Sequence, residues 1–200
     1  MKKTIVMVLA FALVLGVAIG GTLAWLQDIT DPVVNTFTEG KVDIDLYEHK
    51  YDSATNQLTT EEIRNGGNTY KMVPGDVLPK DPTVVVKAGS EACYVFVKVV
   101  KTETVDTFLT YSIDTSVWTP LAGVDGVYYT EITAYTATDT EYNVLTNKQV
   151  TVNTTVDMDD MGDLNTANYP KLTFTAYAIQ KANITDAAAA WAELNPTTTP

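Results

Sequence analysis

The chain has 200 residues, of which 13 are Lys or Arg and 25 are Asp or Glu, so its formal net charge is −12. Because phosphate binding requires a basic surface, this charge balance argues against nucleic acid as a partner. The single cysteine cannot form a disulfide within the chain. The length suits one domain with a full-sized core, which does not need disulfides for stability.

The N-terminus has the three parts of a secretory signal peptide over residues 1–24. Two lysines precede an apolar run from Ile5 to Ile19, and small residues lead to the expected cleavage between Ala24 and Trp25. A bilayer-spanning helix needs roughly 20 apolar residues. The run reaches that length only if it continues to Leu26, so a retained membrane anchor is the alternative. Cleavage leaves 176 residues (200 − 24) with a net charge of −14 (11 − 25).

The mature chain is rich in Val, Thr and Tyr, which favour strands. Clear strands are expected at Val42–Tyr47, Thr83–Lys87, Tyr94–Lys101, Val127–Tyr135, Gln149–Val156 and Leu172–Gln180, and weaker ones at Thr69–Val73 and Leu109–Asp114. Turn signals rich in Gly and Asn separate them. This pattern predicts an all-β fold, namely a two-sheet antiparallel β-sandwich of jelly-roll or Ig-like type.

Helical patterns are few. One short C-terminal helix is expected over Asp186–Leu194, with Thr185 or Asp186 as its N-cap, and a second short helix over Asp157–Leu164. The expected organisation is therefore an N-terminal segment at residues 25–40, a β-sandwich domain at 41–194 and a disordered tail at 195–200.

Residues suited to catalysis are not clustered in the sequence. His49 is the only histidine and is expected to be an exposed polar residue at a strand end. Cys93 begins an apolar run, which favours a buried structural thiol over a nucleophile. A zinc protease needs two histidines on one helical face, and a Ser or Cys protease needs a base beside its nucleophile. We therefore expect no enzyme, no cofactor and no metal site.

Two groups of carboxylates were considered as binding residues. Asp157–Asp163 resembles the start of a calcium loop, but the twelfth position is Asn168, so the bidentate acid is missing. A solvated acidic loop is the preferred interpretation. Asp43 and Asp45 fall on one side of a predicted strand, and we expect them to face solvent.

The N-terminal block invites comparison with a known family. Gly20–Asp28 followed by Asn35–Ile44 resembles the TasA/camelysin family of Gram-positive bacteria, and Val73–Asp76 with Lys80–Val84 resembles the second block of that family. The resemblance is specific over residues 16–101 and generic beyond them. It implies a signal peptide handled by a SipW-type signal peptidase and a sandwich of jelly-roll type. It also implies secretion to the extracellular matrix or cell surface.

The resemblance further implies that the protein assembles with itself into fibres of the biofilm matrix, with accessory matrix proteins as further partners. In such fibres the freed N-terminal segment of one subunit adds as a donor strand to the next. The apolar residues of this segment are Trp25, Leu26, Ile29, Val33, Val34 and Phe37. The alternative is that this segment forms the first strand of its own domain. Membrane contact is expected only through the signal peptide, before cleavage.

Two other functions stay open at this point. Some members of the family have been labelled metalloproteases, although this chain offers one histidine and no matching motif, so no catalytic residue is carried over. The second alternative is a monomeric cell-surface binding module, in which exposed tyrosines such as Tyr128 or Tyr129 would contact a ligand.

Overall fold

The computed structural model describes Lys3 and residues 39–195. The chain divides into two units, Met1–Thr38 and Glu39–Pro200, and every strand described below belongs to the second. Among the described residues, no helix has the length and apolar character needed to cross a membrane.

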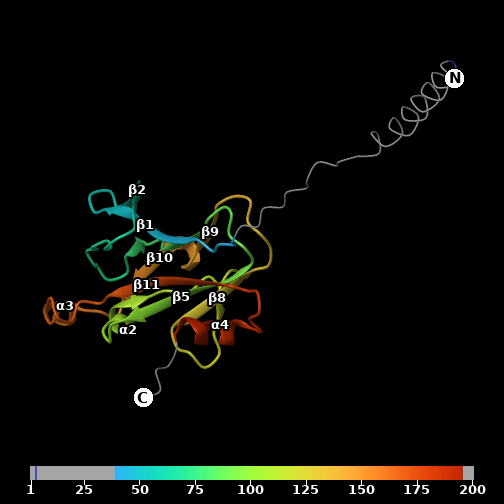
Figure 1. The fold of residues 1–200 in the computed structure, drawn as a ribbon. Helices are drawn as coiled ribbons and strands as arrows, with labels where there is room; N and C mark the ends of the chain where they lie inside the picture. The colour runs from blue at the N-terminus through green and yellow to red at the C-terminus, as the bar shows by residue number, and fades with distance from the viewer. Residues whose placement is uncertain (1–2, 4–38, 196–200) are drawn as a thin grey trace. The chain divides into compact units, whose positions relative to one another are not determined.

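Antiparallel strands dominate the domain (Figure 1), which confirms the predicted all-β class. The strands are β1 (Ile44–Asp52), β2 (Gln57–Ile63), β3 (Val77–Pro79), β4 (Thr83–Val86), β5 (Cys93–Lys101), β6 (Leu109–Thr110), β7 (Thr119–Pro120), β8 (Val127–Ile132), β9 (Thr140–Asn143), β10 (Gln149–Val152) and β11 (Leu172–Gln180). The helices are α2 (Val105–Phe108), α3 (Met158–Gly162) and α4 (Ala187–Leu194), with a 3-10 turn η1 (Thr146–Lys148).

Within the described part of the chain the strands form three sheets, so the predicted count of two is wrong. Their orders are β2-β1-β4-β9, β3-β10-β6 and β11-β5-β8-β7. The first two are separated because Lys80–Pro82 interrupts one long strand and η1 interrupts its partner. Backbone bonds continue across the break, for instance from Lys80 N to the Lys148 oxygen at 2.8 Å. The first two sheets therefore share one layer.

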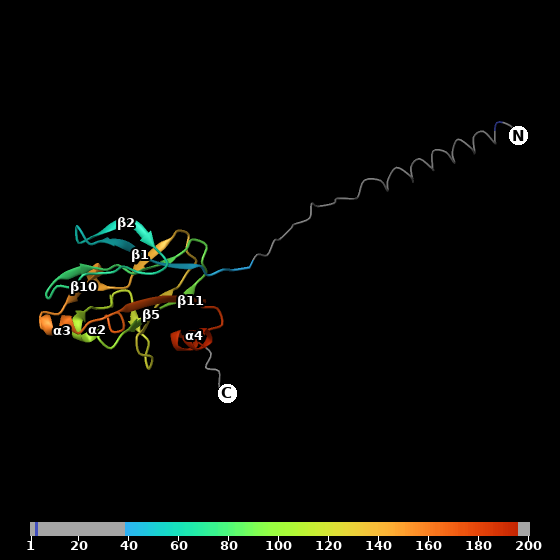
Figure 2. The same cartoon turned by 90° about the vertical axis from the view of Figure 1, so that its left-hand side faces the viewer.

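The main core lies between that layer and the sheet containing β5. Val84 and Val86 of β4 pack with Cys93, Val95 and Val97 of β5, and all five side chains are fully buried. A second cluster, around Leu78 of β3, continues the core toward α3. Figures 1 and 2 show β1 on one side of this core and β11 on the other.

Helix α4 covers the outer face of the β5 sheet. Asp186 is its N-cap, as predicted, and its carboxylate accepts from Ala189 N at 2.8 Å. The Trp191 ring lies 5.2 Å from the Phe96 ring and 5.3 Å from the Tyr177 ring. Because one face of β5 meets the sandwich core and the other meets α4, its residues are apolar at nearly every position.

Element predictions succeeded best in long strands. β11 has the predicted bounds, and β4, β5, β8 and β10 begin within one residue of theirs. The predicted strand at Thr69–Val73 is wrong, because that segment has no strand pairing and runs into a turn at Pro74. The predicted strand at Leu109–Asp114 pairs as a strand only over its first two residues. The short helix expected over Asp157–Leu164 is confirmed as α3.

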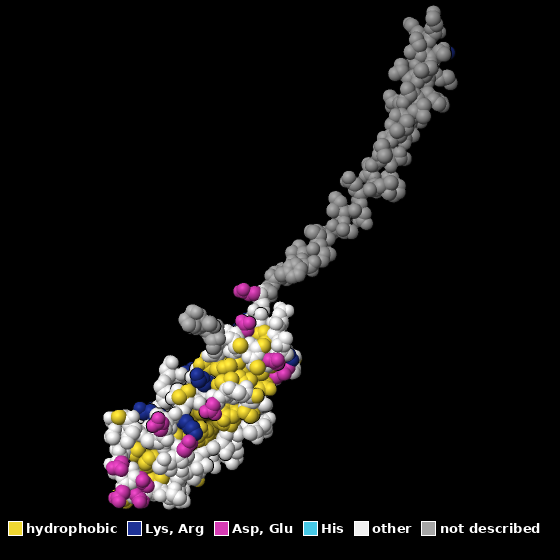
Figure 3. Space-filling model, turned by 90° about the horizontal axis from the view of Figure 1, so that it is seen from below, with side chains coloured by type: hydrophobic (Ala, Val, Ile, Leu, Met, Phe, Trp, Pro, Cys, Tyr) yellow, Lys and Arg dark blue, Asp and Glu magenta, His cyan; other side chains and the backbone are white. Residues whose placement is uncertain are grey.

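The face seen from below Figure 1 carries hydrophobic side chains along its middle, with charged side chains among and around them (Figure 3). Exposed large hydrophobic residues are still few among the described residues. Val100 on β5 is 50% exposed, and Tyr169 before β11 is 46% exposed.

Two glycines allow a matched test of the close approach between the backbone at Gly126 and the backbone oxygen of Val99. Gly126 and Gly123 both have left-handed φ values, 69° and 77°. A Cβ at Gly126 would lie 2.5 Å from the Val99 oxygen, whereas a Cβ at Gly123 meets nothing within 4 Å. Both alanine variants incur backbone strain of about 1–2 kcal/mol. The clash should cost Gly126→Ala about 1–3 kcal/mol more in unfolding free energy, measured by urea titration. Equal losses would contradict the close approach.

Candidate functional site

Strand β11 is a nine-residue edge strand. β5 pairs with it along its full length, from Leu172 opposite Lys101 to Gln180 opposite Cys93. On its other side no described strand pairs with it. An unpaired edge presents a row of backbone donors and acceptors to any extended chain that can reach it.

The hydrogen bonds at both ends of β11 show which residues face the free side. Lys181 N donates to the Ala92 oxygen at 2.8 Å, and the Lys171 oxygen accepts from Thr102 N at 3.1 Å. Odd-numbered residues of β11 therefore direct their backbone groups to β5. Because consecutive residues alternate, the even-numbered residues direct theirs away from it. These are Leu172, Phe174, Ala176, Ala178 and Gln180.

The side chains of the same residues show that the core is less covered here. Phe174, Ala176 and Ala178 point into the core but are only partly buried. The inward residues of the neighbouring strand, such as Val95 and Val97, are fully buried. The free side of β11 is therefore unpaired, although β1 of the facing layer lies close to β11. An additional strand would bond to the free backbone groups and cover the part of these side chains that is still exposed. We call this side of β11 the open edge.

The facing layer is also unpaired at this point. β2 pairs with β1 only from Glu48 onward, which leaves the first residues of β1 without a strand on that side. Ile44 and Leu46 are partly buried there. The Leu46 N–H donates to the Asp45 carboxylate at 2.9 Å, and Arg64 Nε donates to the same carboxylate at 2.6 Å. Asp45 thus satisfies the edge of β1 locally, which corrects its expected role as a simple solvent-facing side chain.

Strand β2 is also an edge, but its composition protects it. Glu61 and Glu62 lie on it, and most of its residues are exposed and polar. Its register with β1 shifts between His49 and Tyr51. Charged side chains and bulges are common protections against edge-to-edge pairing. The apolar open edge of β11 has no such charges between its ends.

A pocket of about 740 Å³ lies at the Leu172 end of the open edge. The loop before β3 forms one wall, and the segment from α3 to β11 forms the other. Its lining is largely apolar and includes Tyr70, Met72, Leu78, Leu109, Met161 and Leu172. We call it the end pocket. Its size and composition fit one or more large apolar side chains.

A buried ion pair borders the end pocket. Lys80 Nζ lies 2.7 Å from Glu48 Oε1, and the two side chains are 10% and 14% exposed. The same ammonium group lies 5.7 Å from the centre of the Tyr70 ring and 5.3 Å from that of Phe174. The pair links β1 to the residue after β3, and its lysine contacts the aromatic ring of the open edge.

The Tyr70 hydroxyl is the one buried side-chain polar atom in the described residues without a hydrogen-bond partner. The nearby Asn68 amide is engaged elsewhere, since its oxygen accepts from Tyr51 N and its nitrogen donates to the His49 oxygen. Burial, and then the charge of Glu48, raise the pKa of Tyr70. The hydroxyl therefore stays protonated, and its oxygen is buried beneath the wall of the end pocket.

His49 is not the exposed loop residue expected from the sequence. It lies inside β1, and its side chain is 28% exposed. Nδ1 lies 2.7 Å from Asp81 Oδ2, and the backbone N–H donates to Asp81 Oδ1 at 3.0 Å. Asp81 is 2% exposed, so this contact satisfies a buried carboxylate at the break between β3 and β4. The role is structural.

Several predicted site residues lie outside the described residues. These are the cleavage residues Ala24 and Trp25 and the donor-strand residues Leu26, Ile29, Val33, Val34 and Phe37. The structure does place the residues that follow them. Lys41 bridges to Ser90, and the Glu91 N–H donates to the Lys41 oxygen at 2.9 Å. The chain thus joins the domain beside the β4–β5 turn.

The acidic segment before β11 uses its carboxylates as helix caps. Asp157 accepts from the Asp159 and Asp160 backbone N–H groups at 2.8 and 2.9 Å, and the Asp160 carboxylate accepts from Asp157 N at 3.1 Å. This capping box explains the clustered acids without calcium. Across the described part of the chain, no group of three or more His, Cys, Asp or Glu residues is placed to hold a metal ion.

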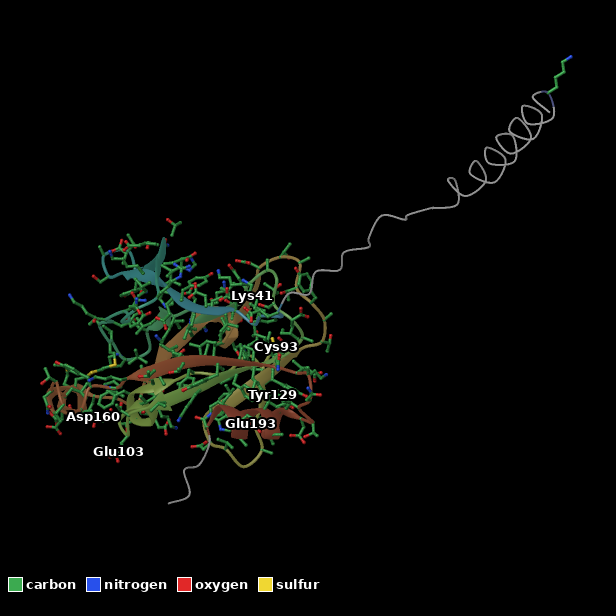
Figure 4. The ribbon with its side chains drawn as sticks, viewed as in Figure 1. Lys41, Cys93, Glu103, Tyr129, Asp160 and Glu193 are labelled. Carbon is green, nitrogen blue, oxygen red and sulfur yellow. The ribbon has the colours of Figure 1, made fainter. Side chains whose placement is uncertain are left out.

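Cys93 lies in the core, and Tyr128 and Tyr129 are partly buried against it. Cys93 is fully buried, as predicted, and burial raises the pKa of its thiol to about 11. Tyr128 is partly buried against the main core, and the Tyr129 ring lies 6.2 Å from that of Phe96. The expectation that these tyrosines are exposed is wrong. Figure 4 shows Cys93 and Tyr129 within the strands of the domain.

The end pocket and the open edge were not predictable from the local sequence. Lys80-Asp81 between two apolar strands was a usable signal, because two charged residues flanked by buried strands require partners. The free side of β11 has no local signature, since edge position depends on the pairing of distant strands. Among known proteins, no family model, no curated protein and no solved structure matches the chain.

The buried ion pair yields a stability prediction. Glu48→Gln leaves the Lys80 ammonium group buried without a counter-charge, so we expect a loss of about 3 kcal/mol in unfolding free energy. Asp106→Asn removes the exposed partner of Lys101 and should leave the urea midpoint nearly unchanged. Replacing both members of the buried pair, Lys80→Met with Glu48→Leu, should recover much of the loss. A small effect of Glu48→Gln would show that the pair is solvated.

Cys93 yields a pH prediction. Because its pKa rises from 9.0 to about 11, folding favours the neutral thiol. This stability is fully present below pH 9 and is lost as pH rises through 11. Iodoacetamide should therefore leave the folded protein unlabelled at pH 8 and label it in urea, as measured by mass spectrometry. Rapid labelling of the folded protein would contradict the burial of Cys93.

Proposed function

We propose that the protein is a secreted structural subunit of extracellular matrix fibres. Assembly occurs when the N-terminal segment of one copy adds as a strand to the next copy. The observation that carries this proposal is the open edge of β11, where backbone groups and partly buried core side chains face the same unpaired side. An added strand satisfies the backbone and covers the apolar surface together.

The apolar side chains of the N-terminal segment contribute to assembly with an energy of the same order as the association costs. Four apolar side chains of the N-terminal segment, if fully buried, contribute on the order of 6–12 kcal/mol before association costs. Backbone hydrogen bonds along the edge add direction and register. An acidic domain also resists nonspecific aggregation through its net charge, so assembly depends on the specific strand.

The proposal includes membership of the TasA/camelysin family and a sandwich of jelly-roll type. The chain crosses between the two layers at β4–β5, β5–β6, β6–β7, β8–β9 and β10–β11. About half of the connections cross between the layers, as they also do in an Ig-like sandwich with sheets ABED and CFG, so the jelly-roll type is proposed from the family resemblance and not from this count. Export through the signal peptide, followed by cleavage between Ala24 and Trp25, frees the N-terminal segment outside the cell.

The cleaved N-terminus is the basis of the decisive comparison. Mature protein beginning at Trp25 should form filaments, and a variant beginning at Glu39 should remain dispersed, as seen by electron microscopy. Before assembly, both should melt with similar midpoints, because the described cores lie within residues 39–195. N-terminal sequencing of secreted protein checks the cleavage bond. Filaments of the truncated variant would reject strand addition by this segment, and dispersed mature protein would reject the fibre function.

A further inference from the structure

We propose that the donor strand lies antiparallel to β11 of the next copy, with Phe37 in the end pocket opposite Leu172. This inference rests on the proposed fibre function and deepens it. It names the acceptor strand, the direction of the incoming chain and the side chain that determines its register. Each of these follows from a separate feature of the described domain and of the sequence.

The direction follows from where the chain joins its domain. Lys41 lies beside Ser90 and Glu91, and β11 ends near the same place, since Lys181 bonds to Ala92. The end pocket lies at the opposite end of β11, beside α3. Figure 4 shows Lys41 and Asp160 of α3 at opposite ends of the domain. In the proposed assembly, copies stack end to end along the direction of β11. The N-terminal segment of one copy extends from its Lys41 end, and the first part of the next copy that it meets is the end pocket.

This stacking places residues near Phe37 at the Leu172 end and residues near Trp25 at the Gln180 end. The donor therefore runs antiparallel to β11. If the segment instead folded back on its own domain, Thr38 would lie at the Gln180 end, and the pairing with β11 would be parallel. Direction thus separates assembly between copies from closure within one copy.

Pro32 determines which face of the donor meets the core. Proline has no N–H, so its backbone must point away from β11. Residues of odd number then bond to the open edge, and their side chains share the face of the inward residues of β11. This places Trp25, Ile29, Val33 and Phe37 on the core side of the donor, together with the polar residues Gln27, Asp31 and Asn35 between them. If the even-numbered residues bonded to β11 instead, Pro32 would face β11 without an N–H to donate. The only large aliphatic residues on the core side would then be Leu26 and Val34.

The end pocket determines the register. Phe37 is the largest apolar side chain in the half of the segment that reaches this end, and the pocket of about 740 Å³ is lined by apolar groups. With Phe37 opposite Leu172, Val33 lies opposite Ala176 and Ile29 opposite Gln180. The 14 residues at 25–38 span about 46 Å, which exceeds the roughly 30 Å of β11.

Disulfide trapping tests direction and register in the full mature chain. The proposal places Thr36 directly opposite Thr173, in a pair whose Cα separation of about 4.5 Å allows a disulfide. Two kinds of copy, each with one introduced cysteine, Thr36→Cys in one and Thr173→Cys in the other, are mixed during assembly, with one kind tagged. The matched control mixes Thr36→Cys with Gln180→Cys, because Thr173 and Gln180 are both exposed positions of β11. Cys93 is buried and does not compete.

The expected result is a disulfide-linked heterodimer with Thr173→Cys at a yield at least about tenfold above that with Gln180→Cys. The reciprocal pair, Ile29→Cys with Gln180→Cys, should also cross-link. Preferential cross-linking of Thr36→Cys to Gln180→Cys would overturn the antiparallel direction. Filaments that cross-link at neither position would overturn β11 as the acceptor while leaving the fibre function intact. Absence of filaments from the mature wild-type protein would reject the fibre function itself.

A second comparison tests the end pocket without cysteines. Phe37→Ala should raise the critical concentration for filament formation roughly tenfold or more, since a buried aromatic side chain is lost. Val34→Ala removes an apolar side chain from the outward face and should change it less than about threefold. Equal effects of the two variants would overturn the assignment of Phe37 to the pocket.

Discussion

The ladder between β5 and β11 determines most of what the domain presents to its surroundings. Its nine residue pairs run without a bulge, so the alternation of β11 is the same from end to end. One set of side chains meets α4, including Tyr177 against Trp191. The other set meets the core and also points its backbone to the free side. A single slip in register would exchange these sets and expose the core face.

The two long edges of the domain differ in how they meet solvent. β2 has acidic and polar side chains and an irregular register, and both features discourage pairing with another chain. β11 has a regular backbone and small inward residues such as Ala176 and Ala178, and no described strand pairs with its free side. Its bordering lysines, Lys171 and Lys181, lie beyond the ladder rather than along it. The domain thus protects one edge and leaves the other open.

The sequence predicted those parts of the fold that depend on local pattern. β5 and β11 are long, strongly patterned strands, and α4 has an N-cap followed by good helix formers, so these elements were recognisable. β7 and β9 are too short to give a periodic signal, and β2 is too polar. The division into three sheets was not predictable. It arises where Lys80–Pro82 and η1 interrupt facing strands, and facing is a property of the folded chain.

The features of the candidate site were likewise predictable only where they depend on local sequence. The apolar N-terminal segment and its Pro32 are visible in the sequence, whereas the open edge requires the order of strands in the sheet, which single residues do not encode. His49 shows the converse, because its isolation suggested exposure until Asp81, 32 residues away, proved to be its partner.

Direction is the property in which sequence and fold constrain each other most closely. The position of Pro32 selects one face of the donor, and that face carries the aromatic residue closest to the domain. The position of Lys41 beside Ser90 selects the end of β11 that this residue meets first. The end pocket lies at that end, although nothing in the local sequence requires it there. In the proposed assembly, the positions of Lys41 and of the end pocket both favour an antiparallel donor, whereas Pro32 selects the face of the donor in either direction.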